Sequence, residues 1–386
     1  MATTVTNDFK QIQQLAVNGG GWLTKKHMCS NGSLLTGGDT YGVWRIKTGE
    51  TSHELLLSFS NVIDAAAATE PANTTDLGGC YAVGACDANP QAIAFVWKSL
   101  VYYRQSDAAD FTALNFTVPA QGASNPNANG AKEGQRKLAI DPVNQEVIYV
   151  GWDYSATGAQ GLWRLMGVSN AATQTTLPLP LTGYNIGVGA IFIDPNSSNV
   201  GSGTTLRKSR VVTSVAGRGV YYSLDGGDTW TGPVAGSPLQ PMTDAAIDSN
   251  GVIWMVAQNA TVYKFSAANV LTNVSGSISG VSNNGGTLGL AVQGTRIIIY
   301  DYVGLSSQST DGGTTFTAMA RTYTMVAGDT PWASTVTTIP NYLSSTWVCF
   351  DAAVTGKLWG IGGQTVWYAT PPTTNYATTN YNITPL

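Results

Sequence analysis

The chain has 386 residues and a formal net charge of −4, and charged residues make up only 11% of it, against roughly 25% in an average soluble domain. Its 44 glycines and 10% aromatic residues favour many short strands joined by turns. They argue against helical bundles and coiled coils, which need charge-rich helices. The 19 Lys and Arg residues form no basic run, so we expect no nucleic-acid partner.

Residues 1–14 carry neither the basic region nor the apolar region of a secretory signal. No stretch of the sequence approaches the roughly 18 uninterrupted apolar residues that a membrane-spanning helix needs. We therefore expect a protein that is made in the cytoplasm without a signal peptide and does not insert into a membrane. It would be built into a larger particle or released by lysis.

One local pattern recurs along the chain: an apolar strand, a turn, and a second strand that pairs an aliphatic residue with an aromatic one. Several copies are preceded by a further strand that ends in Asp, as at Asp141, Asp194 and Asp248. The recurring unit therefore contains four strands. The aliphatic residues of the repeated strand lie about 42 to 61 residues apart, the range of propeller blades: Val43, Val101, Leu162, Val220, Val262, Leu305 and Val366.

A single four-stranded unit cannot bury both of its faces, so the units must stack around an axis. The sequence predicts an all-β fold, a single seven-bladed β-propeller with four-stranded blades over residues 17–370. We expect the ring to close by pairing of a strand near one terminus with the blade of the other, and residues 1–16 are available for this. Residues 371–386 are expected to form an extended C-terminal tail.

Two segments carry the pattern Ser/Thr-x-Asp-x-Gly-x-Thr-Trp/Phe of the Asp-box, directly after the repeated strand. The Asp carboxylate can accept backbone N–H groups across a tight turn, the glycine permits a positive φ, and the aromatic residue covers the sheet edge. We expect both boxes to be structural. Their residues are Ser223, Asp225, Gly227 and Trp230 in the first, and Ser309, Asp311, Gly313 and Phe316 in the second.

Several motifs resemble glycoside hydrolase family 74, the xyloglucanases. They are the Gly-rich opening 19–24, the segment 36–45 (TGGDTYGVWR), the strands that end in Asp-Pro, and the strand 219–222 that runs into an Asp-box. The family has two propellers with a cleft between them, and this chain has room for one. By this resemblance, Asp39 matches the catalytic base. The family's acid comes from the second propeller.

Carboxylates and aromatic residues follow the second strands of three predicted blades, in loops expected to gather at one face. Aromatic rings stack on sugar C–H surfaces and carboxylates accept hydroxyl hydrogen bonds. An inverting hydrolase needs two carboxyl groups roughly 6.5–9.5 Å apart. The catalytic candidates are Asp39, Asp153 and Asp301, although an Asp in a Gly-rich turn more often bonds the backbone. The carbohydrate-binding candidates are Tyr41, Trp152, Tyr154 and Tyr302.

The chain has four cysteines, and Cys80 and Cys86 lie close enough in sequence to pair, although free buried thiols are the favoured interpretation. No CxxC motif occurs, and His27 and His53 are isolated. We therefore expect neither a metal site nor a cofactor.

Three functions are consistent with these features. Low charge and half of the enzyme architecture favour a non-catalytic propeller, a bacteriophage tail or virion component for assembly or host-glycan binding. Its partners would be other virion proteins or further copies of the chain. The alternative is an endo-acting, inverting hydrolase of a β-glucan-like or surface polysaccharide, with Asp39 as base and Asp153 or Asp301 as acid. A lectin-like glycan-binding module is the third.

Overall fold

The computed structural model describes most of the repeated strands and part of the loops between them. Among these residues no helix is long and apolar enough to cross a membrane. The described residues are 23–38, 42–50, 53–57, 80–97, 100–117, 136–152, 161–178, 188–215, 217–240, 242–257, 261–278, 281, 288–300, 306–319, 321–323, 347–362, 365–369 and 381–385.

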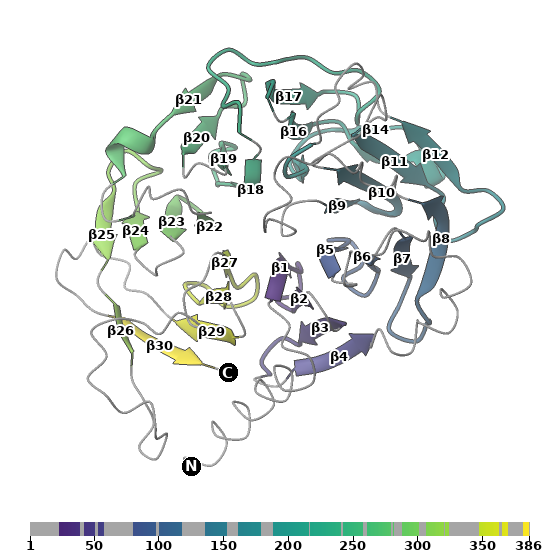
Figure 1. Ribbon diagram of the computed structural model, residues 1–386, viewed down its shortest axis with the longest axis horizontal. Coiled ribbons are helices and arrows are strands. Elements are labelled where there is room, and N and C mark those ends of the chain that lie inside the picture. Colours follow the sequence, from purple (N-terminus) through teal and green to yellow (C-terminus); the bar gives the residue numbers. More distant parts are fainter. Residues whose placement is uncertain are drawn as a thin grey trace.

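The described strands form eight sheets, and seven of them are arranged in a ring around a central axis (Figure 1). In the first six sheets the strands follow the chain from the axis outward. The first sheet contains β1 (Leu23–Met28), β2 (Leu34–Gly38), β3 (Val43–Ile46) and β4 (His53–Leu57). The second contains β5 (Cys80–Ala85), β6 (Ile93–Trp97), β7 (Leu100–Arg104) and β8 (Thr112–Thr117). The third contains β9 (Arg136–Asp141), β10 (Asn144–Trp152), β11 (Leu162–Met166) and β12 (Thr175–Pro178).

The other half of the ring is less regular. The fourth sheet contains β13 (Phe192–Ile193), β16 (Val211–Val215) and β17 (Gly219–Ser223), with a hairpin of β14 (Asn199–Val200) and β15 (Arg207–Lys208) inserted after β13. The fifth contains β18 (Met242–Ile247), β19 (Ile253–Ala257), β20 (Val262–Phe265) and β21 (Leu271–Asn273). The sixth contains β22 (Gly289–Gln293), β23 (Arg296–Tyr300), β24 (Ser306–Ser309) and β25 (Thr317–Met319).

The expectation of seven four-stranded blades is wrong, because six of these sheets have four or more strands and the fourth has three in the described part of the chain. Residues 231–237 run along the outer edge of β17 instead of a regular strand. Thr231 exchanges two backbone hydrogen bonds with Tyr222, and Val234 N–H donates to Val220 O. Pro233 lies between them and has no N–H to donate, so a continuous ladder cannot form there.

The last sheet contains β27 (Trp347–Phe350), β28 (Leu358–Gly362), β29 (Thr365–Ala369) and β30 (Tyr381–Pro385), with β26 (Arg321–Tyr323) parallel to β30 at its outer edge. Residues 381–385, expected in a tail, are therefore a strand of the propeller. All of the described strands of this sheet come from the C-terminal part of the chain, and the expected exchange of a strand between the termini is not seen among them. Residues 1–16 lie outside the described residues.

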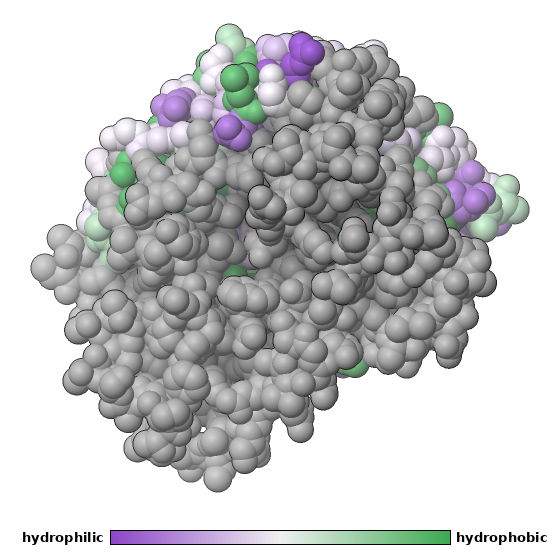
Figure 2. Space-filling model, in the orientation of Figure 1, coloured by the Kyte–Doolittle hydropathy of each residue, from purple (hydrophilic) through white to green (hydrophobic). Residues whose placement is uncertain are grey.

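The hydrophobic core is divided into layers between neighbouring sheets. Leu35 and Val43 of the first sheet pack with Phe95 of the second. Leu34 of the first sheet packs with Trp359 of the last, so the ring closes by packing of its first sheet on its last. Along the rim visible in Figure 2, the coloured residues are a mixture of hydrophilic and hydrophobic side chains.

Acidic residues at the ends of innermost strands fix the turn to the next strand. Asp248 Oδ1 accepts the N–H groups of Asn250 and Val252, while Oδ2 accepts the indole N–H of Trp254 at 3.0 Å. Asp351 does the same with its own turn and with Trp359. The recurring Asp is therefore a turn residue.

The two glycines Gly313 and Gly251 allow a matched test of interior packing. Gly313 has φ +74°, and a Cβ there would lie 1.9 Å from Trp254, whereas Gly251 has φ +76° and open space around it. We expect Gly251→Ala to lower the free energy of unfolding by about 1 kcal/mol, the cost of a positive φ alone. Gly313→Ala should cost at least about 2 kcal/mol more, because the Trp254 ring must move.

The measurement is urea unfolding followed by tryptophan fluorescence. Equal losses in the two variants would show that the Trp254 ring yields without cost.

Candidate functional site

A cavity of about 580 Å³ runs along the axis of the ring. The innermost strand of every sheet contributes to its lining, from β1 through β27, as their central positions in Figure 1 illustrate. Ala and Ile are the most frequent lining residues, and the charged ones are Lys26, Asp87, Lys137, Asp244 and Asp351. This is the site where residues from all parts of the chain meet.

Lys26 of β1 crosses this cavity to three other sheets. Its Nζ lies 2.9 Å from Asp244 Oδ2 of β18 and donates hydrogen bonds to the carbonyl oxygens of Leu290 in β22, at 3.1 Å, and of Val348 in β27. One ammonium group thus connects the first sheet with the fifth, sixth and seventh. Neither partner of this ion pair was predicted from the sequence, because no local pattern places Lys26 opposite a residue more than 200 positions away.

His27 follows Lys26 in β1 and also lines the cavity. The residue retains some exposed surface, but its Nε2 atom has none and has no hydrogen-bond partner. Burial, with a smaller contribution from the Lys26 ammonium, lowers the pKa of His27 to about 4. The ring is therefore neutral near pH 7.

The predicted catalytic and carbohydrate-binding residues fall in loops outside the described residues: Asp39, Tyr41, Asp153, Tyr154, Asp301 and Tyr302. Trp152 is the last residue of β10, and its side chain is also outside the description. The described strands nevertheless fix which edge these loops leave from. Gly37, near the end of β2, lies against Cys80 at the start of β5, and Gly151, near the end of β10, lies against Lys137 near the start of β9. The second strands therefore end at the same edge of the propeller at which the innermost strands begin.

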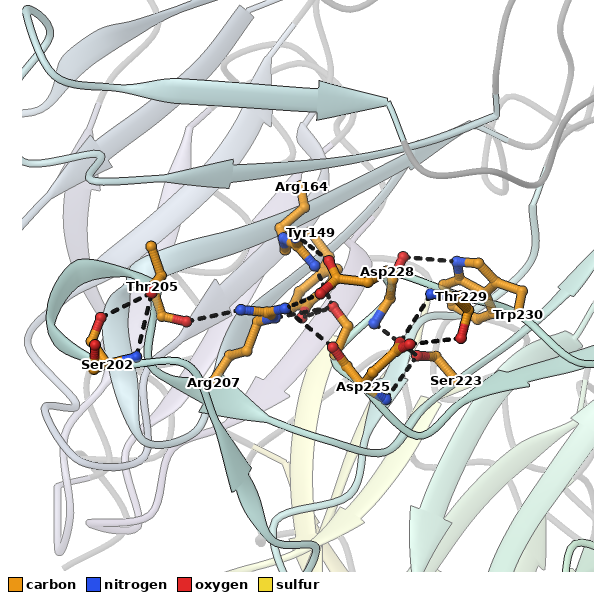
Figure 3. Close-up of polar contacts among 12 residues, drawn as sticks. Tyr149, Arg164, Ser202, Thr205, Arg207, Ser223, Asp225, Asp228, Thr229 and Trp230 are labelled. Atoms are coloured by element: carbon orange, nitrogen blue, oxygen red, sulfur yellow. Dashed lines mark hydrogen bonds and ion pairs between the residues drawn. The ribbon is translucent and has the colours of Figure 1, made fainter.

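The two Ser-x-Asp-x-Gly turns have the same local bonding. Asp225 Oδ1 accepts from Ser223 Oγ at 2.6 Å and from the N–H of Thr229 at 2.9 Å (Figure 3). Asp311 Oδ1 accepts from Ser309 Oγ at 2.7 Å and from the N–H of Thr315 at 3.0 Å. The aromatic residues of both turns pack into core layers between sheets: Trp230 and Phe316.

The donors of these turns act on the acidity of the two carboxyl groups. The Thr315 hydroxyl and N–H lead the bonds that hold the pKa of Asp311 well below its usual range. Burial alone would raise the pKa of Asp225, but the bonds from Ser223 and Thr229 outweigh it and lower the pKa. Both carboxylates are occupied within their turns, which suits a structural role.

These turns lie at the edge opposite to the predicted site loops. Gly312 N–H donates to Thr295 O, in the connection between β22 and β23, and Gly226 N–H donates to Ser209 O just before β16. First-to-second strand connections therefore lie beside the turns. The turns and the strand ends that precede the predicted site loops are separated by the length of a strand.

A cation from the preceding sheet holds each turn. Arg164 of β11 donates to Gly226 O and contacts Asp228 at 2.7 Å, and Asp228 also pairs with Arg207 of the inserted hairpin (Figure 3). Lys264 of β20 donates to the carbonyl oxygens of Gly312 and Gly313.

The turn that follows β7 in the second sheet, residues 105–111, has an equivalent contact, in which Arg45 of β3 pairs with Asp107 at 2.7 Å. The recurrence of Arg45 and Arg164 after third-strand aromatic residues was visible in the sequence. Asp228 and Arg207 were missed, because the hairpin that carries Arg207 is an insertion outside the repeat.

The cysteines do not form a site. All four are free and buried, so Cys80 and Cys86 are not paired. Burial raises the pKa of Cys29 to about 12 and that of Cys349 to about 11, which leaves these thiols unreactive near neutral pH. In the described part of the chain no three His, Cys, Asp or Glu residues are grouped so that they could hold a metal ion. The side chain of His53 lies outside the description.

No known family model matches the sequence, and no curated protein matches it. Among solved structures, the chain is similar to the GH74 enzyme of Niastella koreensis, with a TM-score of 0.64 and 18% identity over 94% of this chain and 54% of that one. It is also similar to the GH74 xyloglucanase of Xanthomonas campestris, with a TM-score of 0.66 and 17% identity over 95% of this chain and 55% of that one.

A third similar structure is the Myceliophteria thermophila Cps50 (Swd1) β-propeller domain, with a TM-score of 0.58 and 9% identity over 92% of this chain and 98% of that one. The chain spans about half the length of the two GH74 structures. These likenesses show the all-β propeller fold.

Arg164 provides a test of the contacts between sheets. Its guanidinium is almost fully buried, whereas Lys47 and Glu54 form an exposed ion pair. We expect Arg164→Gln to lower the free energy of unfolding by about 2 kcal/mol, the loss of charge-assisted hydrogen bonds. Lys47→Gln should cost less than about 1 kcal/mol. Chemical denaturation of both variants measures this difference, and a loss in Arg164→Gln no larger than in Lys47→Gln would contradict it.

His27 should make the fold sensitive to acid. Its pKa of about 4 in the fold is below the ordinary value of 6.5, so the unfolded chain binds the extra proton between these two pH values. The free energy of unfolding should fall as the pH decreases from 6.5 toward 4, by up to about 1.4 kcal/mol per pH unit. His27→Phe should remove this slope in denaturation measured over that pH range, and a slope unchanged in the variant would assign it to other groups.

Proposed function

We propose that this chain is a glycan-binding β-propeller whose binding face is formed by the loops that follow β2, β10 and β23. The observation that carries this proposal is the common edge at which the second strands end, beside the starts of the innermost strands. Sequence places a carboxylate and an aromatic residue directly after each of these strands. Together they supply hydroxyl acceptors and stacking surfaces for one polysaccharide chain.

The likeness to GH74 structures supports a carbohydrate ligand. An inverting hydrolase needs a second carboxyl group across the scissile bond, and in the resemblance drawn from the sequence that acid belongs to another propeller. We further propose that the turns of Asp225 and Asp311 are Asp-boxes. Their carboxylates are saturated by their own turns, as a structural motif requires.

The setting of this binding activity is proposed from composition. A charged content of 11% suits a subunit packed into a symmetric particle, such as a bacteriophage tail or virion, where the propeller would bind host glycan. Partners would be other particle proteins or further copies of the chain. The second candidate function, an endo-acting hydrolase with Asp39 as base and Asp153 or Asp301 as acid, is supported by the same GH74 likeness.

Affinity electrophoresis in gels that contain xyloglucan or mixed-linkage glucan, with reducing-sugar release measured in parallel, tests the proposal. We expect the protein to be retarded by at least one glycan and to release no sugar. Tyr41→Ala and Tyr302→Ala should each weaken binding several-fold, because each removes one stacking surface. Asp110→Asn, on the exposed turn of the second sheet, is the control and should bind as the wild type does.

Sugar release that disappears in Asp39→Asn would instead establish the hydrolase. Absence of binding to every glycan tried, including bacterial surface polysaccharides, would contradict both functions.

A further inference from the structure

We propose that the axial cavity is a second binding site, for a small neutral polyhydroxylated molecule such as a mono- or disaccharide. The choice of sugar rests on the proposed function, but the site is separate from the loops that follow the second strands. It is formed by the innermost strands and by the side chains of Lys26, His27 and Asp244.

The size of the cavity suits such a ligand. Its volume of about 580 Å³ lies within the range of roughly 300–1,000 Å³ that small-molecule pockets have. Its walls belong to the rigid inner strands of the ring, so the space exists without a rearrangement of the sheets. A single sugar ring, or two, can be enclosed in this volume.

The walls offer backbone groups as well as apolar side chains. Each innermost strand pairs with a second strand along one edge only, and its other edge faces the axis. The carbonyl oxygens of Leu290 and Val348 show this, because both accept a hydrogen bond from Lys26 within the cavity. Backbone N–H and C=O groups at such an edge need water or a polar ligand as partners. A sugar hydroxyl group can pair with either an N–H or a C=O group, because it can both donate and accept a hydrogen bond.

The charges in the cavity favour a neutral ligand. Lys26 Nζ forms an ion pair with Asp244 Oδ2 and donates hydrogen bonds to two carbonyl oxygens. The lining also contains Lys137, Asp87 and Asp351, and Asp351 pairs with Lys357. Since Lys26 and Asp244 compensate each other, an ionic ligand beside this pair would bring an uncompensated charge into a partly enclosed space.

Two buried polar atoms in this lining lack a hydrogen bond of good geometry, and both are side-chain atoms: His27 Nε2 and Asp244 Oδ2. Asp244 Oδ2 is close to the Lys26 ammonium, but this contact is an ion pair without a directed hydrogen bond, while Oδ1 already accepts the N–H of Ala245. Buried polar atoms are seldom left in this state. A hydroxyl group can donate to Oδ2, and the neutral imidazole can exchange a hydrogen bond with another.

Ligand-observed saturation-transfer NMR with D-glucose, D-xylose and cellobiose tests this site on the full chain. We expect at least one of these sugars to bind saturably and sodium acetate to give no saturable signal. Asp244→Asn should weaken sugar binding roughly tenfold or more, because a charge-assisted hydrogen bond is lost. The matched change Asp110→Asn on the rim should leave the affinity unchanged.

His27→Phe keeps the test decisive if Asp244→Asn fails to fold. Nε2 has no partner in the described structure, so its removal breaks no hydrogen bond of the fold, yet it should weaken sugar binding several-fold. Binding that is equal in wild type and His27→Phe, or no saturable binding of any of the three sugars, would overturn the proposal. Loss of sugar binding in Tyr302→Ala, with His27→Phe and Asp244→Asn unaffected, would assign it to the loops alone and leave the proposed function standing.

Discussion

Each sheet of this protein has two apolar faces, and the need to bury both of them governs the rest of the structure. A sheet can meet this need only by packing on a neighbour at each side, so the sheets form a closed ring. The core is accordingly divided into layers, as where Val212 and Val220 of the fourth sheet pack with Met255 of the fifth. The axial cavity is a result of the same constraint, because the innermost strands of a ring of this size cannot meet at its centre.

Cations join several pairs of neighbouring sheets. A cation on the third strand of the first, third and fifth sheets reaches the turn of the next sheet, through Arg45, Arg164 and Lys264. The second, fourth and sixth sheets supply the turns that receive them. Interior glycines make this close approach possible, since the Arg207 side chain lies against Gly226 and the Trp254 ring against Gly313. Arg210, just before β16 of the fourth sheet, similarly donates to Ser266 O and Asn269 Oδ1 of the fifth, so such contacts are not confined to alternate sheets.

The propeller was predictable because its signal is local and repeated. Anchors such as Val101 and Val220, singled out by their spacing, are completely buried in the structure. The outer edges of the fourth and last sheets were not predictable. The first is occupied by an irregular segment around Pro233. The second is formed by β30 and, beyond it, β26, whose residues carry no repeat signal.

The candidate site residues likewise fall into a group that the sequence predicted and a group that it did not. The sequence named the residues that follow the second strands, because each repeats the position of its counterpart in another blade. It did not identify Lys26, His27 and Asp244 as one group, because their proximity depends on closure of the whole ring. No local sequence pattern indicates a contact between β1 and the fifth sheet.

Closure of the ring without exchange of a strand among the described residues has a consequence for how the molecule opens. The seam between the last and first sheets is held by side-chain packing and by Lys26, which bonds a carbonyl 322 positions away. Like the interfaces between the other sheets, this seam has no shared strand among the described residues. The seam joins the two ends of the chain, so it brings the largest loss of chain entropy on forming. Its amide hydrogens should exchange with solvent before those at the other interfaces between sheets, and a covalent link across it would raise kinetic stability more than one placed anywhere else in the ring.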